Sequence, residues 1–142
     1  MIVTGADSRY LAPLANLVGS VHFWMPATTI AVFNLGLTVD ELREVASWHN
    51  CRIHWLPGGP PSRLLVAGRW TRCPHLRKLR WYAWKPAAIV EAVQTYGTVL
   101  WIDAGSDLRG PLGPIERILK REGCFLAKGQ DVDMTARLHK GC

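Results

Sequence analysis

The sequence contains no hydrophobic run long enough to cross a membrane. A transmembrane helix needs about 20 consecutive apolar residues, and no stretch of the 142-residue chain approaches that length. No signal peptide opens the chain, because the first strand is predicted to start at residue 2. Internal repeats and low-complexity tracts are also missing. These absences favour a soluble chain with an ordinary folded core.

Signatures of several common chemistries are missing as well. No G-x-G-x-x-G follows the first predicted strand, which disfavours a dinucleotide-dependent dehydrogenase. The histidines have no spacing that suggests a Ser-His-Asp or Cys-His nucleophile. The four cysteines form no C-x-x-C pair and no zinc spacing, so two disulfides and reduced core residues both fit. Because Cys51 and Cys124 each begin a predicted strand, core residues are favoured for Cys51, Cys73, Cys124 and Cys142.

The charge of the chain is unbalanced toward the basic side. It has 17 Lys and Arg residues against 11 Asp and Glu residues, a net charge of +6. This excess could attract a nucleic acid, an anionic membrane or a phosphate-bearing small molecule, or could simply be a solvated surface. Many of the bases lie between Arg63 and Arg80 near Trp70 and Trp81, and interleaved basic and aromatic residues can bind RNA. No RNA-binding motif accompanies them, so a nucleic acid is the less favoured partner.

The hydrophobic pattern predicts the fold class. With 49% hydrophobic residues, the chain is long enough for one domain with a core. Short apolar segments alternate with segments whose apolar residues recur at spacings of three and four. That alternation is typical of a Rossmann-like α/β fold with a mostly parallel sheet and helices on both faces. The predicted strands are 1–4, 29–35, 51–56, 98–102 and 124–127, and the predicted helices are 11–21, 39–48, 86–96 and 114–121.

Residues 57–80 interrupt this alternation. They open with a stretch rich in Pro and Gly, Pro57–Pro61, and continue without a steady period. A long irregular segment in a compact domain is commonly a functional lid or a disordered excursion. We therefore predict a long basic loop or lid at 57–80.

Local signals predict how several helices begin and end. Asp7 can cap the helix that follows the first strand, and Thr38 with Glu41 spells a capping box, T-x-x-E. Pro86 suits the first position of its helix, and Gly97 suits the left-handed residue just past the end. The apolar face of that helix is predicted to consist of Ile89, Val90, Val93 and Tyr96.

Two charged residues stand where a ligand could bind. Asp103 ends the strand predicted at 98–102, whose unbroken apolar run indicates burial on both faces. Open α/β sheets bind ligands at the C-terminal ends of such strands. Lys85 lies near the start of a helix, where its charge opposes the helix dipole. This unfavourable local choice indicates that Lys85 serves another purpose.

These segments resemble a known family. Two blocks of the sequence are similar to the nucleotide-sugar glycosyltransferases of the GT-A fold. The first is Trp81–Leu112, which has the patterns Trp-Lys-Pro and Trp-Ile-Asp-Ala followed by Gly-x-Leu. The second is Ile2–Leu11, which contains Ala-Asp-Ser-Arg-Tyr. The nearest likeness is to glycosyltransferase family 8 and to little-studied related families. The matched blocks cover about half of the chain. We expect residues 1–142 to form a single nucleotide-sugar-binding domain of the GT-A type. Because a complete GT-A domain is longer, we expect this one to be truncated at the C-terminus.

The resemblance implies a function and a set of site residues. It implies a hexosyltransferase-type enzyme that moves a sugar from a nucleotide-sugar donor, most simply a UDP-sugar, to an unknown acceptor. Asp7 and Tyr10 would receive the base and ribose, and Lys85 would contact the diphosphate. Asp103 would be the first carboxylate of a D-x-D element that holds Mn²⁺ or Mg²⁺. Here the third position is Gly105, and the next carboxylate is Asp107.

Several alternatives remain open at this point. Asp107 could complete the metal site, a later segment could supply the second ligand, or the protein could work without metal. The chain could also be a non-catalytic GT-A-like module that binds a nucleotide or a partner, or a basic RNA-binding protein. Eukaryotic members of the family often carry a membrane anchor, so we expect the cytoplasm or, if an anchor is missing, the Golgi or secretory lumen.

Overall fold

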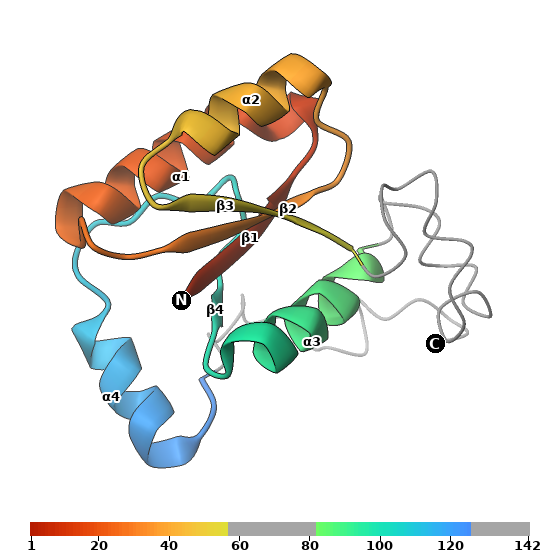
Figure 1. The fold of residues 1–142 in the computed structure, drawn as a ribbon. Coiled ribbons are helices and arrows are strands. Elements are labelled where there is room, and N and C mark those ends of the chain that lie inside the picture. The colour runs from red at the N-terminus through yellow and green to blue at the C-terminus, as the bar shows by residue number, and fades with distance from the viewer. Residues whose placement is uncertain (57–81, 126–142) are drawn as a thin grey trace, which may run out of the picture. The chain divides into compact units, whose positions relative to one another are not determined.

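The computed structural model describes residues 1–56 and 82–125 (Figure 1). The loop or lid predicted at 57–80 lies outside these residues. The chain divides into two compact units, Met1–Gly110 and Pro111–Cys142. None of the helices that the structure describes is long and apolar enough to cross a membrane.

A four-stranded sheet forms the core of the first unit, and its strands are β1 (Ile2–Ala6), β2 (Ile30–Asn34), β3 (Cys51–Trp55) and β4 (Leu100–Trp101). The strand order is β3-β2-β1-β4, and every ladder between them is parallel. This arrangement confirms the predicted α/β fold with a parallel sheet. All four strands therefore end at the same edge of the sheet.

The helices of this unit are α1 (Leu11–Trp24), which follows a 3₁₀ turn η1 (Ser8–Tyr10), then α2 (Val39–Ser47) and α3 (Trp84–Tyr96). Figure 1 shows α1 and α2 on one face of the sheet and α3 on the other. Two crossovers carry the chain from β1 through β2 to β3, and α3 then leads to β4 on the opposite side of β1. Because such crossovers are right-handed, a reversal of direction places the helix on the other face.

The core has one layer on each face of the sheet. Val3 and Phe33 are fully buried and cluster with Trp84, Ala88 and Ala92 of α3. Successive side chains of a strand point to opposite faces, so the residues that alternate with Val3 and Phe33 face α1 and α2. The buried apolar residues of that second layer are Ile2, Ile30, Val32, Leu14, Leu17, Val21 and Val45.

The apolar face predicted for α3 is wrong for its two valines, whereas Tyr96 packs against the core and Ile89 is half-buried. Val90 and Val93 are 46% and 45% exposed. The large side chains Phe33 and Trp84 already fill the layer beneath the helix, so α3 packs through small residues that fit the remaining space. The buried residues of α3 are Trp84, Ala87, Ala88 and Ala92.

This packing predicts that substitutions at two adjacent positions change the free energy of unfolding by very different amounts. Ala92→Leu should lower the free energy of unfolding by about 1–3 kcal/mol, because Ala92 is 1% exposed and a larger side chain must displace packed neighbours. Val93→Ala should change it by less than about 0.5 kcal/mol, as is usual for surface substitutions. Urea unfolding followed by tryptophan fluorescence measures both changes. A larger loss for Val93→Ala would contradict the observed buried face.

The helix ends agree only in part with the sequence signals. Gly97 follows α3 with a positive φ of 74°, as glycine permits, but its ψ of −99° differs from the left-handed helical conformation that was predicted. The helix begins at Trp84, so Pro86 is its third residue and not its first. Proline is tolerated there because the first four N–H groups of a helix have no intrahelical partner. The capping box is confirmed: Thr38 and Glu41 each accept the hydrogen bond that the motif predicts.

Two strand predictions differ from the structure, one in its extent and burial and one in the strand itself. Only Leu100 and Trp101 of the segment 98–102 form a strand, and both are half-buried because β4 lies at an edge of the described sheet. Cys124 is exposed and does not begin a strand, and the rest of the segment 124–127 lies beyond Phe125, the last described residue.

The cysteines therefore divide into different environments. Cys51 begins β3 as predicted and is half-buried, and burial raises the pKa of its thiol to about 11. Within the described residues both Cys51 and Cys124 are free, whereas Cys73 and Cys142 lie outside them. The interpretation as a reduced packing residue fits Cys51 and fails for Cys124.

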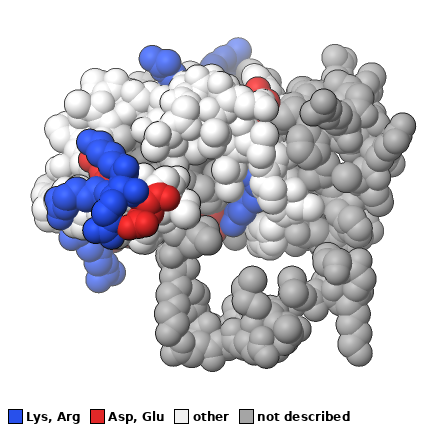
Figure 2. Space-filling view, turned by 90° about the horizontal axis from the view of Figure 1, so that it is seen from below, with Lys and Arg blue, Asp and Glu red and all other residues white. Residues whose placement is uncertain are grey.

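The second unit contains α4 (Gly113–Glu122), the helix predicted at 114–121. Pro114 lies in its first turn, and Gly123, with a φ of 77°, ends it in the left-handed conformation. Its charged residues are of both signs, and Figure 2 shows basic and acidic side chains side by side at this helix. The helix therefore presents no basic patch of a single sign.

The positive charge of the chain is unevenly distributed. Of its 17 basic and 11 acidic residues, 8 and 9 lie in the part of the chain that the structure describes. The excess of positive charge therefore belongs to residues 57–81 and 126–142. Any electrostatic attraction of RNA would have to come from those segments, because the described residues have no net positive charge.

Candidate functional site

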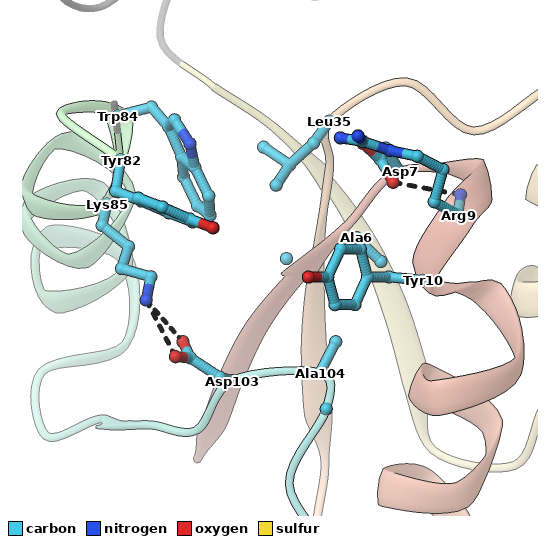
Figure 3. Close-up of a pocket in the computed structure, with 12 residues that line it drawn as sticks. Ala6, Asp7, Arg9, Tyr10, Leu35, Tyr82, Trp84, Lys85, Asp103 and Ala104 are labelled. Carbon is cyan, nitrogen blue, oxygen red and sulfur yellow. Dashed lines mark hydrogen bonds and ion pairs between the residues drawn. The ribbon is translucent and has the colours of Figure 1, made fainter. Parts of the chain in front are cut away.

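A pocket of about 330 Å³ opens at the C-terminal ends of the parallel strands. It lies beside β1 and β4, where the direction of the connections reverses, and open α/β sheets bind ligands at such a point. All four residues that the sequence proposed for nucleotide binding line this one pocket (Figure 3). They are Asp7, Tyr10, Lys85 and Asp103, and the other lining residues are Gly5, Ala6, Arg9, Leu35, Tyr82, Trp84, Ala104 and Gly105.

Asp7 leaves β1 and caps the turn that follows it. Its Oδ1 accepts a hydrogen bond from the Arg9 backbone N–H at 3.0 Å, which confirms the predicted capping role. Its Oδ2 accepts from the Arg9 guanidinium at 2.7 and 3.1 Å. The Asp7 side chain is 17% exposed and that of Arg9 is 79% exposed. The carboxylate is therefore held at the pocket wall by a neighbour that reaches into solvent.

The turn that carries Tyr10 is tied to the neighbouring loop. The Ser8 hydroxyl lies 2.6 Å from the Glu41 carboxylate and 3.0 Å from the Gly36 carbonyl oxygen. Asn34 is buried, and its Oδ1 accepts hydrogen bonds from the backbone N–H groups of Gly36 and Leu37. These contacts hold the ends of β1 and β2 in a fixed relation, so Asn34 has a structural role.

Lys85 and Asp103 form an ion pair at the opposite wall. The Lys85 Nζ lies 2.7 Å from Oδ1 and 2.9 Å from Oδ2 of Asp103. The Trp101 indole N–H donates to Oδ1 of the same carboxylate at 2.6 Å. The pair forms because α3 runs antiparallel to the strand that it leads to, so its first turn lies at the end of β4. The sequence assigned both residues to one site but did not predict that they bind each other.

The charges of this pair depend on each other. Burial by itself raises the pKa of Asp103, but hydrogen bonds from Lys85 and Trp101, together with the lysine charge, outweigh it and lower the pKa below the ordinary value. A lysine in the first turn of a helix is unfavourable beside the helix dipole, and the Asp103 carboxylate offsets that cost. The Lys85 ammonium also lies 5.2 Å from the ring centroid of Tyr82 and 6.0 Å from that of Trp101.

Two tyrosines face the pocket from opposite walls. Tyr10 comes from η1 and is 44% exposed, and Tyr82 precedes α3 and is 57% exposed. In Figure 3 their phenol hydroxyls point toward each other across the pocket. Sequence analysis found Tyr10 only through the family resemblance and did not select Tyr82. No periodic signal could have found Tyr82, because it lies outside a regular element.

Small residues form the floor of the pocket. At Gly5, an added Cβ would lie 3.1 Å from a Leu35 methyl carbon and 3.3 Å from the Trp84 ring, so glycine permits these side chains to close over the strand. Trp84 is 5% exposed and belongs to the core. Gly105 follows Asp103 and leaves the backbone accessible at the opposite side of the floor.

The described residues do not assemble the metal site that the D-x-D comparison implied. Asp107 lines a neighbouring hollow with Asn16 and Phe23, and its carboxylate lies 3.7 Å from the Arg109 guanidinium. Within residues 1–56 and 82–125, no group of three His, Cys, Asp or Glu side chains is placed to hold a metal ion. A divalent cation prefers several oxygen ligands, and here Asp103 is already neutralised by a lysine.

Comparison of the chain with protein-family models, with curated proteins and with solved structures finds no match. The likeness to GT-A glycosyltransferases therefore depends on the residues quoted from the sequence and on the pocket that they line. The structure adds the parallel α/β sheet and the position of the pocket on it.

Proposed function

We propose that this pocket is the donor site of a glycosyltransferase and binds the nucleoside diphosphate part of a UDP-sugar. The observation that supports the proposal most is the convergence of Asp7, Tyr10, Lys85 and Asp103 on one pocket. They come from separate elements, and each has the chemistry that a different part of a nucleotide sugar requires. The position at the C-terminal ends of parallel strands is also where such folds bind nucleotides.

Each wall of the pocket suits one part of the donor. The half-exposed ring of Tyr10 offers a surface for the base, and the Asp7 carboxylate can accept hydrogen bonds from ribose hydroxyls. Lys85 and the N-terminal end of α3 provide positive charge for the diphosphate. When the bond between sugar and diphosphate breaks, UDP leaves with both electrons, and this fixed charge stabilises it.

The prediction that Mn²⁺ or Mg²⁺ takes part stays a prediction. Of the two carboxylates proposed as its ligands, Asp107 lines a different hollow and Asp103 is paired with Lys85. The proposal therefore assigns the stabilisation of the diphosphate to Lys85. A divalent cation is tested as a separate arm of the binding experiment.

Calorimetric titration of the full chain with UDP tests the proposal directly. We expect saturable binding that is selective for UDP over GDP, measured with and without Mn²⁺. Any part of the affinity that depends on Mn²⁺ should be lost in Asp103→Asn, since the amide removes a charged oxygen ligand. A folded chain that binds neither nucleotide would contradict the donor-site proposal.

A second candidate function is a non-catalytic module that binds a nucleotide. It is favoured by the ion pairs of the pocket, because Asp7 is paired with Arg9 and Asp103 with Lys85. Both carboxylates that line the described pocket are thereby neutralised. Release of UDP from UDP-glucose distinguishes the two functions: turnover supports the enzyme, and binding without turnover of this donor favours the module. The RNA-binding alternative stays a prediction that concerns residues 57–81 and 126–142.

A further inference from the structure

Tyr82 has an unusual backbone conformation for its residue type. Its φ is 57°, in the left-handed region that favours glycine, and it is one of two non-glycine residues with positive φ in the part of the chain that the structure describes. Its carbonyl oxygen accepts the Lys85 backbone N–H at 3.0 Å, so the conformation belongs to the start of α3. A side chain in this region is disfavoured, whereas glycine adopts it readily.

The conformation has a clear consequence for the side chain. The phenol of Tyr82 is 57% exposed, and in Figure 3 it extends from the start of α3 across the pocket toward Tyr10. Its ring is not part of the buried cluster that contains Trp84. The core formed by residues 1–56 and 82–125 therefore does not require an aromatic ring at this position. Strained residues concentrate at binding sites, where the surrounding structure holds a side chain toward a ligand.

We propose that Tyr82 is a ligand-binding residue and forms, with Tyr10, the aromatic walls that contact the planar base of the nucleotide. This inference rests on the proposed donor site. Both tyrosines line the pocket together with the small residues Ala6 and Ala104, and in Figure 3 the two phenols face each other across it. Stacking of a base on an aromatic side chain is a strong and sequence-tolerant contact.

A structural role would leave different evidence. The Lys85 ammonium lies 5.2 Å from the centroid of the Tyr82 ring, so the ring could serve only to hold the lysine in place. In that case loss of the ring would weaken the binding of every ligand that Lys85 contacts, including inorganic pyrophosphate. If the ring instead contacts the base, its loss should weaken the binding of UDP and leave the binding of pyrophosphate unchanged.

The test compares Tyr82→Gly and Tyr82→Phe with the unaltered chain, using UDP and inorganic pyrophosphate as calorimetric ligands. Because glycine suits the backbone conformation, the Tm of Tyr82→Gly should lie at most about 3 °C below that of the unaltered chain. We expect Tyr82→Gly to lose about 5- to 150-fold in UDP affinity with pyrophosphate affinity unchanged. Tyr82→Phe keeps the ring and should bind UDP within about two-fold of the unaltered chain.

The possible failures are distinguishable. Equal losses for UDP and pyrophosphate in Tyr82→Gly, or no loss for either ligand, would overturn the role of Tyr82 while the donor-site proposal stands. A loss in Tyr82→Phe as large as that in Tyr82→Gly would also overturn base stacking. If the unaltered chain binds no UDP, the donor-site proposal fails and the inference fails with it.

Discussion

Replacing Lys85 with alanine is expected to weaken UDP binding by about 10- to 100-fold and to leave uridine binding within about two-fold. Hydrogen bonds to charged groups contribute about 1.5–3 kcal/mol, and uridine has no phosphate for the lysine to contact. Lys85 is suited to this role because its side chain is 27% exposed and its ammonium is held at the pocket by Asp103. Calorimetry with UDP and uridine measures both affinities.

Two control variants make this result interpretable. Lys120 is an exposed lysine of α4 that is not among the residues lining the pocket, and Lys120→Ala removes the same charge from the chain. UDP affinity should stay within about two-fold in that variant. Lys85→Ala also leaves the Asp103 carboxylate without its cation, which would repel a diphosphate. The double variant Lys85→Ala with Asp103→Asn removes this repulsion, so recovery of full UDP affinity would mean that Lys85 makes no direct contact with phosphate.

Replacing Phe33 with alanine is expected to lower the free energy of unfolding by about 3–5 kcal/mol. Phe33 lies in β2, is 0% exposed and packs in the layer between the sheet and α3. Removal of its ring leaves a cavity, because a sheet fixed by parallel ladders on both sides of β2 collapses only partially. The loss should be visible as a lower midpoint in urea unfolding followed by tryptophan fluorescence.

Phe23 provides a matched control for that substitution. It is a phenylalanine of α1 that is 78% exposed, so Phe23→Ala removes the same atoms from a surface position. The free energy of unfolding should change by less than about 0.5 kcal/mol. Similar losses in Phe23→Ala and Phe33→Ala would contradict the burial on which the fold description depends.

The relation between sequence and structure is clearest in α3 and the residues around it. The helix, its closing glycine and the carboxylate after the next strand were all predicted, because turn chemistry and apolar spacing act over a few neighbouring residues. The buried face was predicted correctly for Tyr96, which packs against the core, but not for the two valines. The larger residues Val90 and Val93 were predicted to face the core. Instead the small residues Ala88 and Ala92 are buried, because Phe33 and Trp84 occupy the available volume.

The candidate site shows the same division. Asp7, Tyr10, Lys85 and Asp103 were proposed from strand ends and from the family resemblance, and they line one pocket. Asp107 was proposed with Asp103 for a metal, but it lies in another hollow beside α1. A spacing of four residues in an irregular segment does not determine the direction of either side chain, so only the folded backbone could separate them.

The sequence by itself determined the alternating α/β plan, the caps of α2 and η1, and the carboxylates that follow β1 and β4, since each depends on residues close together in the chain. The tertiary structure decided which face of α3 is buried, that Lys85 pairs with Asp103, and that Tyr82 stands opposite Tyr10. Those outcomes depend on which elements pack against each other and on the volume left between them. Local spacing carries no information about either.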